Sequence, residues 1–296
     1  MNKYFCGNYS WKKMKDRDIF HVENMLCDWE NDYVNACGRF LSRVPSRDCV
    51  WALQHQQFPG FKKIPAETKR FSALIINSRS TLMPVLCGLE EIPAPRFLKS
   101  FFRTKKIHSV QGLKNEVMIL ENAIEKMGRK IIDVFDYDLM ALDDLPLGTD
   151  RPCPENLVLR APKMIDLDKA APLQAGYEKE EVLHRGSVFS PASSRVNLAN
   201  IIAKGQILTA ELNGIMVGKI NVSTFSFNRC QIGGVYIHPD FRGMGIARRM
   251  TKEFIVPFIN QGKGITLFVK KNNIPAQKLY SGLGFKKVRD YRITYY

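Results

Sequence analysis

A short stretch in the second half of the chain, "RGMGIA" (residues 242–247, here called the glycine turn), places an arginine and two glycines directly before a segment of helical periodicity. Backbone N–H groups at the start of a helix have no partner within the helix, and the helix dipole favours an anion there. Gly243 and Gly245 let the backbone approach a ligand without a Cβ clash. Arg242 adds a forked cation that matches phosphate oxygens. These residue types and their spacing indicate a phosphate-binding turn.

Three interpretations of the glycine turn compete. A dinucleotide-binding fold needs a third small residue at another position and an acidic residue at the end of the next strand, "GITLFVK", and the sequence has neither. A nucleotide-binding P-loop needs Gly-x-x-x-x-Gly-Lys-Ser/Thr, which "NQGKGIT" does not supply. The third interpretation is structural, with glycines that only let a helix pack on a strand.

Two sequence blocks together favour a fourth interpretation. "VYIHPDFRGMGIARRM" resembles motif A, Gln/Arg-x-x-Gly-x-Gly/Ala, of the GNAT superfamily of acyl-coenzyme A-dependent N-acyltransferases. Further on, "NNIPAQKLYSGLGFKKV" resembles motif B of that family, Asn-x-x-Ala-x-x-Leu-Tyr-x-x-x-Gly-Phe. The positions that match motif B are Asn273, Ala276, Leu279, Tyr280, Gly284 and Phe285. The resemblance covers residues 155–296 and is greatest to the branch with glycine N-acyltransferase-like and two-domain members.

The resemblance implies how an acetyl-coenzyme A donor would bind. In this family the donor lies in a cleft where two neighbouring parallel strands separate. The backbone of Val235, Tyr236 and Ile237 would pair with the pantetheine arm. One N–H group there would polarise the thioester carbonyl, an oxyanion-hole role worth ~3 kcal/mol. The pyrophosphate would lie on the N–H groups of the glycine turn, whose residues are Arg242, Gly243, Met244, Gly245, Ile246 and Ala247.

The resemblance also suggests residues for proton transfer. Tyr280 would be the general acid that protonates the departing thiolate, and its alternative role is an aromatic side chain that lines the cleft. Asn273 would hydrogen-bond the pantetheine arm or cap a helix. Family members often place a glutamate base on the third strand of the domain, where this sequence has Gln231 in "RCQIGGVYI".

The general base is therefore not evident from the sequence. Glu180 and Glu181, in "YEKEEV", would either face the acceptor or belong to a solvated helix face. His238 directly precedes Pro239 and is interpreted as part of the loop. A water relay is the remaining route for the proton, and no metal site is expected.

The elements that would position these residues alternate through residues 151–296. After the proline-rich boundary "LDDLPLGTDRPCPEN", the predicted order is strand, helix, β-hairpin, strand, helix, strand, helix and strand. The first helix is predicted over "MIDLDKAAPLQAGYEKEEVL" with Asp166 as its N-cap, and "LNG" is the hairpin turn. The predicted fold class is α/β (α+β), a mixed twisted sheet flanked by helices, and the resemblance implies the GNAT fold.

Residues 1–150 are predicted to form a domain of their own. "VNACGRFLSRV" and "LKNEVMILENAIEKMG" are helical patterns, the second ending at Gly128, and "CVWALQH", "RFSALIINS" and "IIDVFDYDLMAL" are predicted strands. No second glycine turn of the motif A type occurs here, so coenzyme A binding is not expected. The segment "SVQGLKNEVMILENAIEKMG" resembles the degenerate GNAT-like first half of two-domain members. We expect this half to cover the acceptor side of the site or to form a homodimer surface.

Charge and composition limit the partners. Residues 151–296 hold 22 Lys and Arg against 10 Asp and Glu, a balance of +12, whereas residues 1–150 have a balance of +3. This asymmetry indicates an anionic partner such as coenzyme A. The Lys and Arg residues are dispersed and no nucleic-acid motif accompanies them, which argues against nucleic acid. Seven widely spread cysteines without zinc-site spacing favour reduced thiols in the cytoplasm. No apolar segment has the length of a membrane span.

The leading hypothesis is an acetyltransferase that moves an acetyl group from acetyl-coenzyme A to a primary amine by direct attack on the thioester. The acceptor would be an amine-bearing small molecule, an amino acid or a peptide. The alternative is a non-catalytic coenzyme A sensor or regulatory module, which the missing third-strand carboxylate favours. The sequence leaves the acceptor, the acyl chain length and the oligomeric state open.

Overall fold

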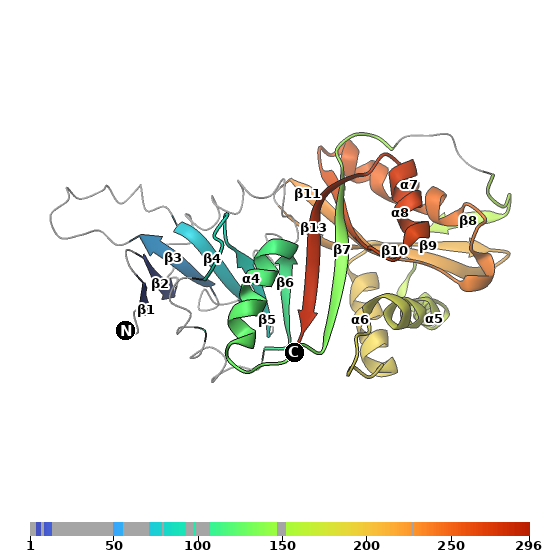
Figure 1. The fold of residues 1–296 in the computed structure, drawn as a ribbon. Helices are drawn as coiled ribbons and strands as arrows, with labels where there is room; N and C mark the ends of the chain where they lie inside the picture. The colour runs from blue at the N-terminus through green and yellow to red at the C-terminus, as the bar shows by residue number, and fades with distance from the viewer. Residues whose placement is uncertain are drawn as a thin grey trace. The chain divides into compact units, whose positions relative to one another are not determined.

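The computed structural model of the 296-residue chain describes residues 4–6, 9–13, 50–55, 71–78, 80–92, 98, 107–146, 152–226 and 228–296. Its contacts divide the chain into two compact units. Unit 1 is Met1–Tyr137 with Arg289–Tyr296, and unit 2 is Asp138–Val288. The strands β7 (Asp133–Leu142) and β13 (Lys286–Tyr295) each contribute residues to both units (Figure 1). The chain thus passes from one unit to the other inside strands, before the proline-rich stretch and again near its last residues.

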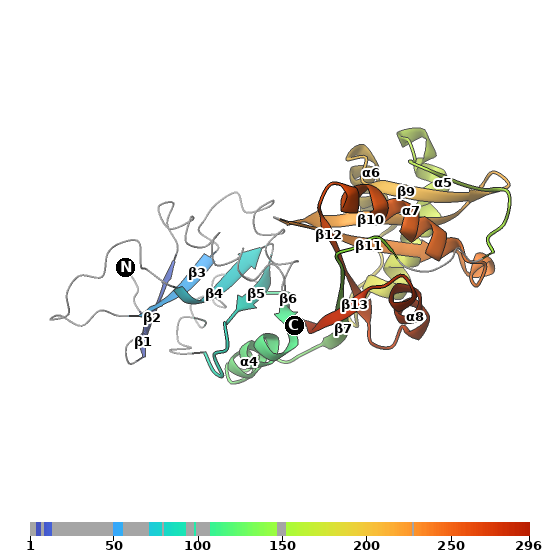
Figure 2. The same cartoon turned by 90° about the horizontal axis from the view of Figure 1, so that it is seen from above.

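Unit 1 has a sheet of neighbouring strands in the order β1-β2-β3-β4-β5-β6-β13. Only β5 and β6 run parallel among the pairings described here, and β13 pairs antiparallel with β6 through Tyr291–Tyr295. The helix α4 (Lys114–Glu125) packs against β5 and β6 (Figure 2). The remaining strands are β1 (Tyr4–Cys6), β2 (Tyr9–Lys13), β3 (Val50–His55), β4 (Phe71–Ser78), β5 (Thr81–Val85) and β6 (Ser109–Leu113).

The helix α4 forms where its sequence pattern predicted it. Val117, Leu120 and Ile124 repeat at helical spacing and are each 0% exposed in the core of unit 1. Gly128 follows the helix with a φ of 85°, a conformation that glycine adopts without strain. The predicted strands around residues 50–55, 71–78 and 133–142 are also present. The predicted helix "VNACGRFLSRV" lies outside the described residues.

Charged side chains attach the last strand to unit 1. Arg292 donates from Nε and Nη2 to the two carboxylate oxygens of Asp136, at 2.8 and 3.0 Å. A third N–H of Arg292, on Nη1, reaches Glu121 Oε2 of α4 at 3.3 Å. The hydroxyl of Thr294 hydrogen-bonds the other oxygen of Glu121. These contacts join β13 to both β7 and α4.

Unit 2 has a mixed sheet in the order β7-β12-β11-β10-β9-β8, in which β11 and β12 are parallel. The helices α5 and α6 cover one face of this sheet and α7 covers the other (Figure 1). Its elements are β8 (Leu157–Arg160), α5 (Leu167–Tyr177), α6 (Pro191–Ala203), β9 (Ile207–Leu212), β10 (Ile215–Phe225), β11 (Arg229–Ile237), α7 (Ile246–Asn260), β12 (Gly264–Lys270) and α8 (Ile274–Gly282).

Two sequence signals in unit 2 act as predicted. Asn213 and Gly214, at φ values of 50° and 80°, form the turn between β9 and β10, which the "LNG" signal indicated. Along α7, Ile246, Met250 and Phe254 form the buried face that packs in the main core of unit 2. The alternation of β and α elements therefore follows the predicted order except around the first helix.

The first helix differs from the prediction. A 3₁₀ turn, Met164–Asp166, precedes α5, and a π-helical turn, Glu178–Val182, follows it. Asp166 stands at the N-cap of α5, but its carboxylate accepts from the backbone N–H of Lys163 and from the guanidinium of Arg160. Arg160 is the stronger attraction because it is a cation, and it lowers the pKa of Asp166.

The helix α6 was missed by the sequence analysis. It begins after Ser190, whose hydroxyl oxygen accepts from the N–H of Ser193 at 3.2 Å, and Pro191 occupies the first turn. A serine N-cap followed by proline is a helix-start signal in its own right. Its apolar face is narrow, with Leu198 and Ile202 buried, so the periodicity was weak.

Within the described part of the chain, no helix is long and apolar enough to cross a membrane. The same residues contain no group of three or more His, Cys, Asp or Glu side chains arranged to hold a metal ion.

A buried carboxylate in unit 1 gives a testable pH dependence. Glu116 is 6% exposed, and its Oε1 accepts from the N–H groups of Leu86 and Cys87 at 2.7 and 3.1 Å. Burial raises the pKa of Glu116 from 4.5 to about 7, against the lowering effect of these two hydrogen bonds. Between these two pKa values the native state holds a proton that the unfolded state has released, so stability falls as pH rises through that window.

We predict that Glu116→Gln removes this pH dependence, because glutamine keeps an acceptor for Leu86 and Cys87 but does not ionise. Thermal unfolding at about pH 5 and about pH 8 measures it. The melting temperature of the variant relative to the wild type is expected to be higher at the alkaline pH than at the acidic pH. Parallel curves for the two proteins would contradict the prediction.

Candidate functional site

The parallel pairing between β11 and β12 stops early. Arg229, Cys230 and Gln231 pair with Gly264, Ile265 and Thr266, respectively, and these are the described pairs of the two strands. Both strands continue beyond this point, β11 to Ile237 and β12 to Lys270. On its other side β11 stays paired, with Tyr236 opposite Lys219 and Ile237 opposite Gly218 of β10. The backbone at Val235, Tyr236 and Ile237 therefore has a strand partner on the β10 side and no described pair with β12.

A bulge in β11 coincides with this separation. The register with β10 shifts between the pair Asn221–Gly233 and the pair Lys219–Tyr236, which leaves one more residue on β11 than on β10. Gly234 lies in the bulge at a φ of 61°, a conformation that other residues seldom adopt. A bulge bends a strand and increases its local twist, so it turns the end of β11.

The glycine turn follows β11 through a 3₁₀ turn at Pro239–Phe241. Gly243 and Gly245 have φ values of 80° and 75°, and Gly245 is the N-cap of α7. The first hydrogen bond of this helix runs from the N–H of Arg249 to the carbonyl of Gly245, at 3.1 Å, and no side chain caps the start. A Cβ placed on Gly243 would meet no atom within 4 Å. The turn thus combines open space with the N-terminal N–H groups of a 15-residue helix.

Arg242 is directed at the π-helical turn that follows α5 in this structure. Its Nη2 donates to both oxygens of Glu180, at 3.1 and 2.9 Å, and its Nε donates to the carbonyl of Ile237 at 3.0 Å. The hydroxyl of Tyr236 donates to Glu180 Oε1 at 2.8 Å, and the guanidinium of Arg242 lies 5.3 Å from the centre of the Tyr236 ring. The structure therefore brings Glu180, for which the sequence analysis left open an acceptor-facing role or a solvated helix face, into contact with two predicted donor-binding residues.

This contact affects the acid–base properties of Glu180. Burial acts to raise the pKa of Glu180, but the hydrogen bonds from Tyr236 and Arg242 outweigh it, and the pKa lies below its ordinary value. Burial and the neighbouring Glu180 carboxylate raise the pKa of Tyr236. A carboxylate with a lowered pKa, paired with a guanidinium, is a weak base.

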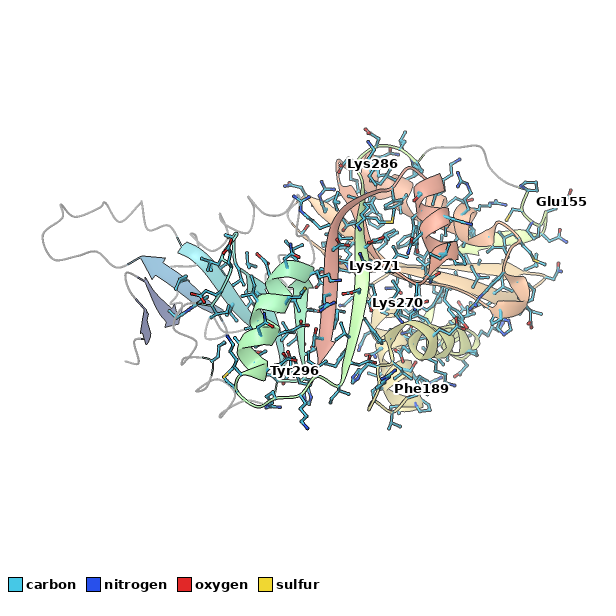
Figure 3. All side chains as sticks on the ribbon, in the orientation of Figure 1. Glu155, Phe189, Lys270, Lys271, Lys286 and Tyr296 are labelled. Carbon is cyan, nitrogen blue, oxygen red and sulfur yellow. The ribbon has the colours of Figure 1, made fainter. Side chains whose placement is uncertain are left out.

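Glu181 forms a second cluster, with α8 and the end of β12. Asn273 donates from Nδ2 to Glu181 Oε1 at 3.0 Å, and the ammonium of Lys270 lies 3.6 Å from Glu181 Oε2. Lys270, labelled in Figure 3, also donates to the backbone carbonyl of Glu180 at 3.2 Å. Asn273 Oδ1 accepts from the N–H of Ala276, so this residue also caps α8. The π-helical turn is thus attached to β11 through Glu180 and to β12 and α8 through Glu181.

Tyr280 lies on α8 and is 6% exposed. Its ring meets that of Phe285 edge to face, with centroids 5.8 Å apart, within the main core of unit 2. Burial raises the pKa of Tyr280, and the neighbouring Tyr177 and Glu181 raise it further. The phenol therefore stays protonated through the neutral range, which is the form that a proton donor requires.

Three further residues near the bulge carry polar groups that the sequence analysis did not assign to the site. Lys219 of β10 is 0% exposed and contacts Gly234. Gln231 is buried, and its Oε1 has no hydrogen-bond partner among the described residues. His238 stands in the loop, with Nδ1 3.6 Å from Asp240 and its ring edge to face with Phe241. A lysine inside the apolar run "IMVGKINV" and a glycine pair inside a strand were the available signals.

Comparisons with solved structures show the fold. A GCN5-related N-acetyltransferase from Sphaerobacter thermophilus is 16% identical, with a TM-score of 0.61 over 98% of this chain and 96% of that one. A tandem GNAT protein from the clavulanic acid biosynthesis pathway is 12% identical, with a TM-score of 0.54 over 97% of each chain. The chain covers 65% of a GNAT-family structure from Novosphingobium aromaticivorans, at 19% identity and a TM-score of 0.41. The first two matches extend over nearly the whole chain and confirm the predicted fold class.

Sequence comparison finds a family to which part of the second unit is similar. No curated protein matches the chain. The model of the acetyltransferase (GNAT) family matches residues 177–285, which run from the end of α5 to the residue before β13 and include every position that matches motif A or motif B. Residues 177–285 of unit 2 are therefore similar to the acetyltransferase (GNAT) family.

Proposed function

We propose that unit 2 transfers an acetyl group from acetyl-coenzyme A to a primary amine. The observation that carries this proposal is the combination of a parallel strand pair that separates after Gln231 and an uncapped helix start behind Gly245. Such a combination offers a backbone edge for an extended amide-containing arm and, directly after it, N–H groups for a pyrophosphate. Coenzyme A has both parts in that order.

The residues of the glycine turn fit a polyphosphate. Gly243 leaves open space beside the helix start, and the first turn of α7 contains no acidic side chain. Arg242 is exposed enough, at 47% of its side chain, for an incoming phosphate to compete with Glu180 for its guanidinium. The exposed charge pair contributes little to stability, so exchanging one anion for another is not costly.

In the proposed reaction the acceptor nitrogen attacks the thioester carbonyl carbon, and the C–S bond breaks as the new C–N bond forms. A backbone N–H in the segment Val235–Ile237 would stabilise the oxyanion, a contribution of about 3 kcal/mol. Tyr280 would give its proton to the leaving thiolate. Glu180 and Glu181 are both engaged with cations, so the amine proton would leave through water.

A non-catalytic coenzyme A-binding module is the second candidate. Gln231 in place of a carboxylate and the pairing of Glu180 and Glu181 with cations favour it. The amine class of the acceptor, the glycine N-acyltransferase-like branch and the cytoplasmic location stay predictions.

Two measurements on the full chain test the proposal. Calorimetry with acetyl-coenzyme A measures donor binding, which both candidates require. A free-thiol assay with a panel of amino acids, polyamines and arylalkylamines then measures turnover. Binding with amine-dependent thiol release supports the transferase, binding without turnover supports the sensor, and no binding at about millimolar donor would overturn both.

We predict that Gly243→Ala weakens acetyl-coenzyme A binding by about tenfold, because the added methyl fills the space proposed for the pyrophosphate. Gly262→Ala is the matched control, since Gly262 has a φ of 77° and equally open surroundings but lies beyond the other end of α7. Both variants should lose about 1 kcal/mol of stability through backbone strain. Calorimetry should find weaker binding in the Gly243 variant only, and an equal loss in both would contradict the placement of the donor.

We predict that Tyr280→Phe lowers kcat by roughly 10²–10⁴-fold and leaves the affinity for acetyl-coenzyme A unchanged, because the ring stays and only the proton donor is lost. Tyr296→Phe is the control, since that hydroxyl is also buried, has no hydrogen-bond partner among the described residues and belongs to unit 1. Wild-type kcat in the Tyr280 variant would instead support the role of an aromatic side chain that lines the site.

A further inference from the structure

The strand β10 carries a lysine at a position where its neighbours are apolar. Lys219 is 0% exposed, and Val217 and Ile220 beside it belong to the main core of unit 2. A buried ammonium is strongly disfavoured unless its N–H groups find partners. The groups that Lys219 contacts on this central strand and its neighbours are therefore of interest.

The ammonium of Lys219 contacts three groups. It donates to the carbonyl of Gly234 at 2.9 Å and to Oδ1 of Asn221 at 3.2 Å. The third partner is the ring of Tyr177 at the end of α5, whose centre lies 4.7 Å from Nζ. Lys219 thus joins three elements, β10, β11 and α5.

The contact with Gly234 is made at the bulge of β11. A Cβ on Gly234 would collide with Oδ1 of Asn221 and lie 2.7 Å from Nζ of Lys219, so only glycine leaves room for both side chains. The carbonyl of Gly234 points at the lysine because the bulge has turned it out of the regular ladder. Without a donor this buried carbonyl would be unsatisfied, and the strand would gain by returning it to a regular pairing.

We propose that Lys219 is a positioning residue, whose ammonium holds the Gly234 carbonyl and so fixes the bulge from which Val235, Tyr236 and Ile237 present their backbone to the donor. This inference rests on the proposed function, since it assigns a purpose to the position of that backbone. Lys219 itself is fully buried and is not a catalytic residue. Its effect on the reaction passes through one carbonyl group.

Lys219 can donate a hydrogen bond to the Gly234 carbonyl whether its side chain is charged or neutral. Burial lowers the pKa of Lys219 to about 7, while the carboxylate of Glu178 acts in the opposite direction. The groups around Nζ are the Gly234 carbonyl, the Asn221 amide and the Tyr177 ring. A neutral amine still has two N–H groups, which is enough for the two oxygens.

The test compares two ligands in one variant. Lys219→Met removes the donor and keeps much of the side-chain volume. We expect its affinity for acetyl-coenzyme A to fall about tenfold, while its affinity for the nucleotide half of coenzyme A, which lacks the pantetheine arm, stays at the wild-type value. Calorimetry on the full chain measures both. An equal fall for both ligands, or no fall for either, overturns the proposal.

A double variant separates positioning from stability. In Lys219→Met/Asn221→Leu neither buried polar side chain remains, so its melting temperature should exceed that of the single variant. Its affinity for acetyl-coenzyme A should remain about tenfold below that of the wild type, because the Gly234 carbonyl still lacks a hydrogen-bond donor. Recovery of wild-type affinity together with stability would show that Lys219 is only structural.

A measurement on the wild-type chain covers the case in which neither variant folds. In a chain with ¹⁵N-labelled lysine, the Lys219 side-chain nitrogen should give a solvent-protected N–H signal, from the ammonium or from the neutral amine, which Lys219→Arg removes. The absence of such a signal overturns the proposal. If the wild-type chain binds neither ligand, the proposed function itself is contradicted. If the wild-type chain binds acetyl-coenzyme A and the variants bind it with the same affinity, only the role of Lys219 is contradicted.

Discussion

The site depends on the point at which β11 leaves β12. Up to Gln231 the two strands share a regular parallel ladder, and beyond it β11 stays paired with β10 only. A strand freed on one edge would ordinarily remain straight enough to pair again, but the bulge at Gly234 turns it away. The glycine turn and the start of α7 follow after one 3₁₀ turn, so their direction depends on how this strand ends. One local break in pairing therefore determines where the backbone edge and the helix terminus lie.

Two carboxylates connect the π-helical turn Glu178–Val182 to these elements. Glu180 joins the π-helical turn to Arg242 and Tyr236, and Glu181 joins it to Lys270 and Asn273. A π-helical turn is an uncommon conformation that occurs frequently at functional sites, and here the carboxylates of Glu180 and Glu181 both have hydrogen-bond or ion-pair partners. A rearrangement of the glycine turn would therefore also displace the π-helical turn after α5, because Arg242 pairs with Glu180. The pairing also explains why these glutamates are poor candidates for a free general base.

Turns, helix caps and the hairpin, which depend on a few adjacent residues, were mostly predicted from the sequence. Side-chain partners that meet only through tertiary packing were predicted less well. The glycine turn, the N-cap of α8 and the hairpin at Asn213 depend on a few adjacent residues, and each is recognisable in isolation. The partner of Arg242 could not be predicted, because Glu180 is far from it in sequence and reaches it only through the packing of α5 on β11. The contact between Lys219 and Gly234 could not be predicted for the same reason, since Gly234 lies on the neighbouring strand. The helix α6 was missed because its apolar face is narrow, although Ser190 and Pro191 are a recognisable helix-start signal.

The final strand has a consequence for how the chain is made. Unit 1 contains Arg289–Tyr296, which pair with β6 and place Arg292 and Thr294 against Asp136 and Glu121. Synthesis on the ribosome delivers these residues after all of unit 2. Unit 1, although its first residues are translated before unit 2, therefore cannot complete its sheet until all of unit 2 has been translated. Cutting the gene at the proline-rich stretch would separate unit 1 from a strand of its own, so its two halves are unsuited to independent expression or to exchange by recombination.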